Sequence, residues 1–253
     1  MAVRRDQSSE HYDVAFKNVE GLVWLPWVGE NYPNRPPLSR LLIVAESHYI
    51  KAGGGEDDDV RRKQLEKLRK QHTTDKQYTR AVVSEYCVND SWGCCNRTLD
   101  GIPKTLFGTV EIDRERFWSD AAFYNFVQRP MDYQRQGGPE QATWDDFSSA
   151  WPVFLEVIKI LEPSHCLFFG VRASNTFNAT VIDTGIAGQA VTLRGQINKV
   201  SPREAAIEIN NRTVPLTFLK HPAKFFSPGE WNNYLTAHHP TLMKWIREER
   251  YAG

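Results

Sequence analysis

The feature that most constrains the fold is a short apolar run that ends abruptly in polar side chains. Residues 41–45 are all apolar, and Glu46, Ser47, His48 and Tyr49 follow them at once. A continuous apolar run of this length is typical of a strand buried on both faces, as strands of parallel sheets are. The sequence therefore predicts a parallel strand over residues 41–45 whose carboxyl end carries a polar cluster.

Three further apolar segments, 121–127, 165–170 and 216–220, are predicted strands. Predicted helices are 60–71, 151–161 before Pro163, a helix beginning at 172–178, and 230–250 with a break at Pro240. Residues 72–115 are predicted to be irregular. Strands separated by helices favour right-handed β-α-β units. We therefore expect an α/β fold: one three-layer α/β/α domain over residues 1–253, with a central, mainly parallel four-stranded sheet and an insertion at about residues 50–115.

Composition narrows the classes of protein. Lys and Arg number 31, as do Asp and Glu, so a uniformly basic nucleic-acid coat is excluded while a local basic groove is not. No apolar run reaches the ~18 residues of a membrane-spanning helix, and the N-terminus lacks an apolar leader. We expect a cytoplasmic monomer that does not bind membranes.

The four cysteines, Cys87, Cys94, Cys95 and Cys166, form no Cys-x-x-Cys pair. This spacing favours reduced structural thiols. Separately, we expect the protein to work without a metal or an organic cofactor. A metal held by Cys87, Cys94 and Cys95 stays open as an alternative, although adjacent cysteines chelate one tetrahedral ion poorly.

Polar side chains follow each predicted strand. In open parallel sheets, ligands bind in the crevice beyond the carboxyl ends of the strands. Glu46 to Tyr49 lie there after the first strand, Asn125 near the end of the second, Gly170 and Arg172 after the third, and His221 after the fourth. The sequence therefore predicts a cleft where a carboxylate, an amide, imidazoles and aromatic rings meet.

Four motifs lie in this order along the chain: Val44-Ala45-Glu46-Ser47-His48-Tyr49, Phe123-Tyr124-Asn125, Leu167-Phe168-Phe169-Gly170 with Ala173 beyond, and Lys220-His221-Pro222-Ala223. Their order resembles that of the uracil-DNA glycosylase superfamily. The family has a polar or water-activating first motif, an Asn that reads the pyrimidine, an apolar strand that ends in a small residue, and a final His-Pro-Ser with a wedge loop. The resemblance implies this fold and base-excision chemistry.

The chain also departs from the family pattern. Glu46 or Ser47 stands where relatives place Asp, Asn or Ala, and Ala223 stands where Ser is usual. The stretch between the first two motifs is long, and the four spaced cysteines of the iron–sulfur branch are absent. The resemblance therefore supports the fold and base-excision chemistry better than it supports ordinary uracil specificity.

The resemblance assigns roles to the cleft residues. Glycosidic hydrolysis builds positive charge on the sugar and negative charge on the departing base. His221 is the expected donor to the base, and Glu46 and Ser47 are expected to serve the sugar and its water. Asn125 would pair with the pyrimidine edge. His48 would contact phosphate or sugar, and Tyr49 would form a wall of the pocket. Structural alternatives stay open: a capping His221, a turn-tying Asn125, an ion-paired Glu46, and shaping roles for Ser47, His48 and Tyr49.

The resemblance also implies a DNA surface. Enzymes that act on duplex bases flip them out, and Phe225 and Phe226 stand where the family inserts its wedge, next to Lys220 and Lys224. The basic residues of segment 61–70 would contact phosphates. The alternatives are two core phenylalanines and a solvated helix face.

These residues lead to one main hypothesis. The protein is expected to be a DNA glycosylase that releases a uracil-like or modified pyrimidine, in DNA repair or against the hypermodified bases of phage DNA. Two alternatives stay open: a non-catalytic DNA-binding module on the same fold, and a nucleoside or nucleotide hydrolase.

Overall fold

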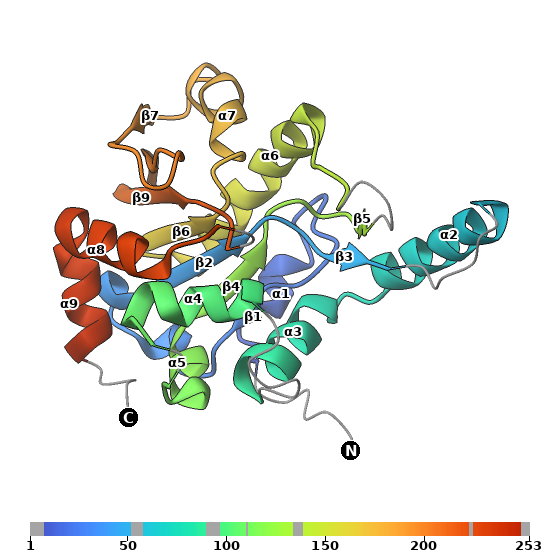
Figure 1. The fold of residues 1–253 in the computed structure, drawn as a ribbon, viewed down its shortest axis with the longest axis horizontal. Helices are drawn as coiled ribbons and strands as arrows, with labels where there is room; N and C mark the ends of the chain where they lie inside the picture. Colours follow the sequence, from blue (N-terminus) through green and yellow to red (C-terminus); the bar gives the residue numbers. More distant parts are fainter. Residues whose placement is uncertain are drawn as a thin grey trace.

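A seven-stranded mixed sheet forms the centre of the fold (Figure 1). The structure is a computed structural model that describes residues 8–51, 58–89, 97–109, 111–133, 139–222 and 225–248. The strand order is β1-β4-β2-β6-β9-β8-β7. The strands are β1 (Trp27–Val28), β2 (Leu41–Ala45), β4 (Ala122–Asn125), β6 (His165–Phe169), β7 (Gly188–Leu193), β8 (Arg203–Ile209) and β9 (Arg212–Leu219). A separate two-stranded sheet pairs β3 (Tyr49–Ile50) with β5 (Met131–Asp132) in parallel.

The four central strands β4, β2, β6 and β9 are parallel to one another. Their apolar runs explain this position, because every residue of β4 and β6 and four of the five in β2 are buried. Ala45 pairs with Asn125, and Phe169 pairs with Leu219. The carboxyl ends of all four strands therefore meet at one edge of the sheet.

Helices pack on both faces of the sheet. One face lies against α1 (Asp13–Phe16), α6 (Trp144–Leu161) and α7 (Ser174–Phe177), the last followed by the π-helical segment η5 (Asn178–Ile182). The opposite face lies against the π-helical segment η4 (Val83–Val88) and the helices α4 (Arg97–Phe107), α5 (Arg114–Asp120), α8 (Pro228–His238) and α9 (Pro240–Glu248). Alternate strand residues supply the two cores: Val44 and Tyr124 face α6, while Ile43 and Phe123 face the α4 side.

Several predicted elements are confirmed. The strand at 41–45 has the expected bounds, and β4 and β6 lie within their predicted segments. Helix α6 ends at Leu161, where Glu162 adopts φ 48° ahead of Pro163. Its start is earlier than predicted, because Thr143 and Asp146 form a capping box. The predicted break before Pro240 separates α8 from α9.

Two expectations are wrong. The sheet is mixed and larger than the four mainly parallel strands predicted, because β1, β7 and β8 add antiparallel strands at its edges. Residues 72–115 are not irregular in the parts that the structure describes. They hold the end of α2 (Asp58–Thr74), α3 (Tyr78–Val82), η4 and α4. Of these, η4 and α4 pack against the core through a few scattered apolar side chains.

Helix α2 lies within the predicted insertion and projects from the body of the molecule (Figure 1). None of the helices in the described segments combines the length and the apolar character that crossing a lipid bilayer requires.

Candidate functional site

The candidate site lies at the edge where the parallel strands end. The loop after β2 carries Glu46, β4 ends in Asn125, Gly170 follows β6, and His221 follows β9. The sheet registers place these strand ends side by side. The predicted convergence of the four motifs at one edge follows from this topology.

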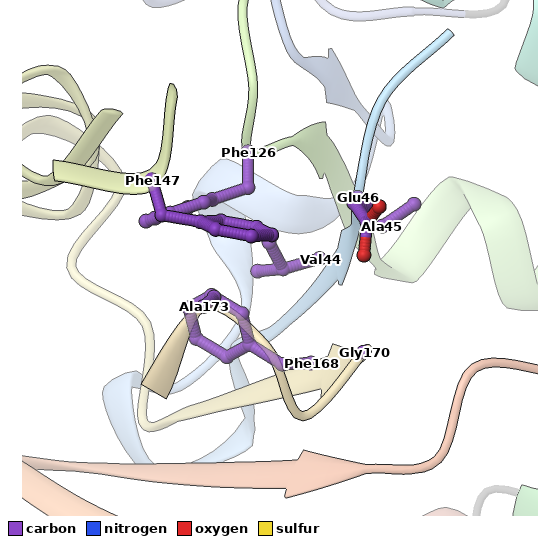
Figure 2. Close-up of a pocket in the computed structure, with 8 residues that line it drawn as sticks. All are labelled: Val44, Ala45, Glu46, Phe126, Phe147, Phe168, Gly170 and Ala173. Atoms are coloured by element: carbon purple, nitrogen blue, oxygen red, sulfur yellow. The ribbon is translucent and has the colours of Figure 1, made fainter. Parts of the chain in front are cut away.

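Glu46 stands at the rim of a small apolar cavity (Figure 2). The cavity has a volume of about 10 Å³, which is about the space of one water molecule. Figure 2 shows the aromatic rings of Phe126, Phe147 and Phe168 grouped on one side and the Glu46 carboxylate apart from them. The other lining residues are Val44, Ala45, Gly170 and Ala173. An added Cβ at Gly170 would lie 3.6 Å from Glu46 Oε2, so this small residue borders the carboxylate.

Burial raises the pKa of Glu46 above its ordinary value. The guanidinium of Arg172 opposes that effect, Asp146 adds to it, and the hydroxyl of Tyr49 lowers the pKa. Burial and the Glu46 charge raise the pKa of Tyr49 to about 12. Tyr49 therefore keeps its proton at neutral pH and is a donor beside a carboxylate that protonates more readily than usual.

Arg172 is fixed at the rim beside Glu46. Its guanidinium donates to Gln141 Oε1 and to the Ala142 carbonyl, each at 2.5 Å, and lies 5.4 Å from the Phe147 ring centroid. Sequence reasoning placed Arg172 in the cleft but gave it no role. Its positive charge lowers the pKa of the half-buried Glu46.

The Ser47 hydroxyl joins two loops of the site. Its oxygen lies 2.7 Å from the Arg129 carbonyl oxygen and 3.1 Å from that of Val127, and its single proton is donated between them. These contacts tie the loop after β2 to the loop after β4. Ser47 thus has the shaping contacts that were one of its two predicted roles.

Asn125 and His48 form a buried pair. Asn125 Nδ2 lies 2.8 Å from His48 Nε2, and Thr79 Oγ1 lies 2.8 Å from the same nitrogen. Asn125 is 2% exposed and His48 is 7% exposed. Sequence reasoning missed Thr79, because it lies in the segment predicted to be irregular and 31 residues from His48.

His221 is half-buried in the turn after β9. Burial lowers the pKa of its imidazole, so the ring is neutral near pH 7. Among the described residues, no side chain or carbonyl forms a hydrogen bond with this ring. Its nitrogens are thus available to a ligand in the cleft.

The loop that follows His221 presents one aromatic ring to solvent. Phe225 is 88% exposed and adopts φ 59°, and Lys220 Nζ donates to the Phe225 carbonyl at 2.6 Å. Phe226 instead packs against the core, stacked on Trp231 with ring centroids 6.2 Å apart and an interplanar angle of 5°. Phe226, packed between α4 and α8, thus fits the core alternative, whereas Phe225 is exposed as a wedge would be. Lys224 and Ala223 lie outside the described residues.

Helix α2 divides its cations between two faces. Arg61 donates to both carboxylate oxygens of Asp132, at 3.1 and 2.9 Å, and Arg69 lies 3.6 Å from Glu140. Leu65, on the same face, packs with Ile50. Four cations on the remaining surface are exposed: Arg62, Lys63, Lys67 and Lys70.

No group of three metal-binding side chains gathers within the segments that the structure describes. Cys87 and Cys166 are buried, and Cys94 and Cys95 lie outside the described residues. A search of protein-family models and of curated proteins gives no match to this chain.

Proposed function

We propose that the protein is a DNA glycosylase that hydrolyses the N-glycosidic bond of a flipped-out uracil-like or modified pyrimidine and leaves an abasic site. In this proposal it has a uracil-DNA glycosylase-like three-layer fold, is a cytoplasmic monomer, and needs no metal or cofactor. One observation carries the proposal: the half-buried Glu46, the amide of Asn125 and the imidazole of His221, which has no hydrogen-bond partner among the described residues, lie where neighbouring parallel strands end at one edge of the sheet.

The two charges of the reaction have candidate partners. His221 is neutral and free of protein hydrogen bonds in the described structure, so it can donate to the carbonyl oxygen of the departing base. Glu46 supplies negative charge toward the oxocarbenium-like sugar or orients water for it. Tyr49 keeps its proton and hydrogen-bonds with the Glu46 carboxylate, which it thereby orients.

The size of the cavity decides where a base binds. A pyrimidine ring is far larger than a cavity of about 10 Å³. Glu46 lies on the α6 side of the sheet edge with Val44, whereas Ala45 and its register partner Asn125 alternate onto the α4 side. We expect the base to lie on the α4 side, between Asn125 and His221, with the Glu46 carboxylate toward the sugar.

DNA engagement has two candidate elements. The exposed ring of Phe225 has the size of a base-pair wedge, and its left-handed backbone is held by Lys220. The exposed cations of α2 can track phosphates on the flanking duplex, because the face of the helix that carries Arg61 and Arg69 is turned to carboxylates of the body.

The proposal is tested with duplexes that carry uracil, hypoxanthine or modified cytosines. Each is incubated with the protein and then cleaved with alkali at abasic sites. The expected result is strand cleavage on at least one duplex, with loss of that activity in the H221A variant. DNA binding without cleavage on any duplex would identify a non-catalytic module, and base release from free nucleosides alone would identify a nucleoside hydrolase.

A further inference from the structure

Among the described residues, one neighbour forms a hydrogen bond with the side chain of Asn125. Its Nδ2 lies 2.8 Å from His48 Nε2, and its main-chain oxygen accepts from Gln128 Nε2 at 2.5 Å. An amide nitrogen can only donate. His48 Nε2 is therefore the acceptor, and the amide group is fixed with Nδ2 toward His48.

The protonation of His48 is consistent with this role. Burial, with a smaller contribution from His72, lowers the pKa of His48 to about 3. The ring is thus neutral, and its proton lies on Nδ1. The hydroxyl oxygen of Thr79 also lies 2.8 Å from Nε2 and packs against this edge of the ring.

Packing prevents the imidazole from turning away. Trp24 and Tyr78 contact the His48 ring edge to face, with centroids at 4.9 and 4.6 Å. Trp24 is fully buried, and its Nε1 donates to the His72 carbonyl at 2.8 Å. His48 is therefore a rigid acceptor for the amide.

This arrangement decides what Asn125 can read. Its Oδ1 makes no hydrogen bond to another described residue, so the amide presents an acceptor and one remaining N–H. Uracil offers a donor, N3–H, next to an acceptor, O4. Cytosine offers an acceptor, N3, next to a donor, the N4 amino group. A fixed amide matches only one of these orders, whereas an amide free to flip matches both.

We infer that His48 is a positioning residue that locks the orientation of the Asn125 amide and thereby confines the site to one class of pyrimidine edge. This inference rests on the proposed function, since it assumes that Asn125 reads a base. The class favoured under that proposal is the keto edge of uracil-like bases.

The lock itself can be observed without any activity. Protein labelled with ¹⁵N in Asn and His is examined by NMR for a scalar coupling across the hydrogen bond between Asn125 Nδ2 and His48 Nε2. The expected result is a cross-peak between these nitrogens, with His48 protonated on Nδ1. A His48 ring protonated on Nε2, or no coupling in a folded sample, would overturn the inference.

The consequence is tested by specificity. The H48F variant keeps a ring against Trp24 and Tyr78 but has no acceptor, and H48Q restores one. The ratio of kcat/KM for uracil over cytosine should fall about tenfold in H48F and recover in part in H48Q. The matched control is H72F, because His72 also contacts Tyr78, at 4.3 Å, but not Asn125.

The two levels of the proposal can fail separately. If the parent protein releases no base, the proposed function fails. The ratio is then measured as relative affinity for duplexes with a uracil or cytosine mismatch. An unchanged ratio in folded H48F would overturn the inference even where the coupling is present. Should H48F not fold, the coupling between Asn125 Nδ2 and His48 Nε2 in the parent protein decides the matter alone.

Discussion

Gly101 of α4 lies directly against Pro222 in the turn that carries His221. An added Cβ at Gly101 would stand 2.3 Å from Pro222 Cβ and 3.7 Å from Phe226 Cε1. Glycine alone allows this approach. The contact couples the position of α4 to that of the candidate catalytic imidazole.

The G101A variant tests this coupling. Alanine has the better helix propensity, but the added methyl must displace α4 or the turn. We expect a loss of about 1–3 kcal/mol in the free energy of unfolding and a larger relative loss of base excision. Urea unfolding and single-turnover kinetics measure the two. The matched control is G229A in α8, where no atom lies within 4 Å of the added Cβ; equal effects at both sites would contradict the coupling.

Replacement of His221 separates chemistry from folding. The H221A variant should lose about 10²–10³-fold in excision rate, the usual value of one donor to a developing anion. Its melting temperature should change little, because the ring has no hydrogen bond to the described residues. The control H238A alters an exposed histidine of α8. Excision within a few-fold of the parent in H221A would remove His221 from the mechanism.

The two adjacent phenylalanines should behave differently. The F225A variant should keep its stability within about 0.5 kcal/mol, as surface substitutions do, and should lose excision on duplex DNA but not on single strands. The F226A variant removes a ring stacked on Trp231 and should lose about 1–3 kcal/mol. Thermal unfolding and parallel assays on both DNA forms distinguish them. A wedge role is contradicted if F225A lowers excision equally on both.

The raised pKa of Glu46 sets the direction of two pH effects. Because the folded state binds its proton more tightly than the unfolded chain, this residue destabilises the fold increasingly as pH rises through the folded pKa. E46Q should therefore be more stable than the parent at neutral pH, with the difference vanishing in acid. The excision rate of the parent should fall in acid, with a midpoint above the usual glutamate pKa of about 4.3. The excision rate of E46Q should not show this fall. The free energy of unfolding and the excision rate, each measured against pH for both proteins, test these two effects. Identical profiles for the parent and E46Q would contradict them.

Helix α2 should contribute to DNA affinity through its exposed lysines. A K63Q/K67Q double variant should reduce the slope of log affinity against log salt by about 0.9 for each phosphate that a lysine no longer neutralises. Fluorescence anisotropy with unmodified duplex measures this without need of catalysis. The control is K159Q/K244Q on α6 and α9, at two exposed lysines that pair with glutamates. Identical slopes in the two double variants would show that α2 is a solvated helix.

The sequence pattern predicts the central strands because burial on both faces demands unbroken apolar runs. All five residues of β2 are apolar, as are the four residues of β6 that follow His165. β7 carries no such signal, since its residues Gly188–Leu193 are mostly exposed. β1, β3 and β5 have two residues each, too few for any period to be read.

The positions of those site residues that directly follow a strand could be predicted from the sequence. Glu46, Asn125 and His221 were expected at one edge, and parallel topology puts them there. Contacts that depend on packing between distant segments were not predictable. The neighbours of His48 come from residues 24, 78 and 79, and no local pattern marks such a meeting.

The β8–β9 hairpin gives this chain a particular order of assembly. Ile209 pairs with Arg212 across Asn210 and Asn211, which adopt φ 50° and 58°, the backbone of a type I′ turn. Hairpins form in about 1–10 μs, whereas the parallel pairs of β2 must first close long crossovers. We expect β9 to gain its first partner locally and then to serve as a preformed edge for β6. The strand that ends next to His221 would then be among the earliest parts of the sheet to form. The cleft would be completed last, when β2 and β4 join the sheet on the other side of β6.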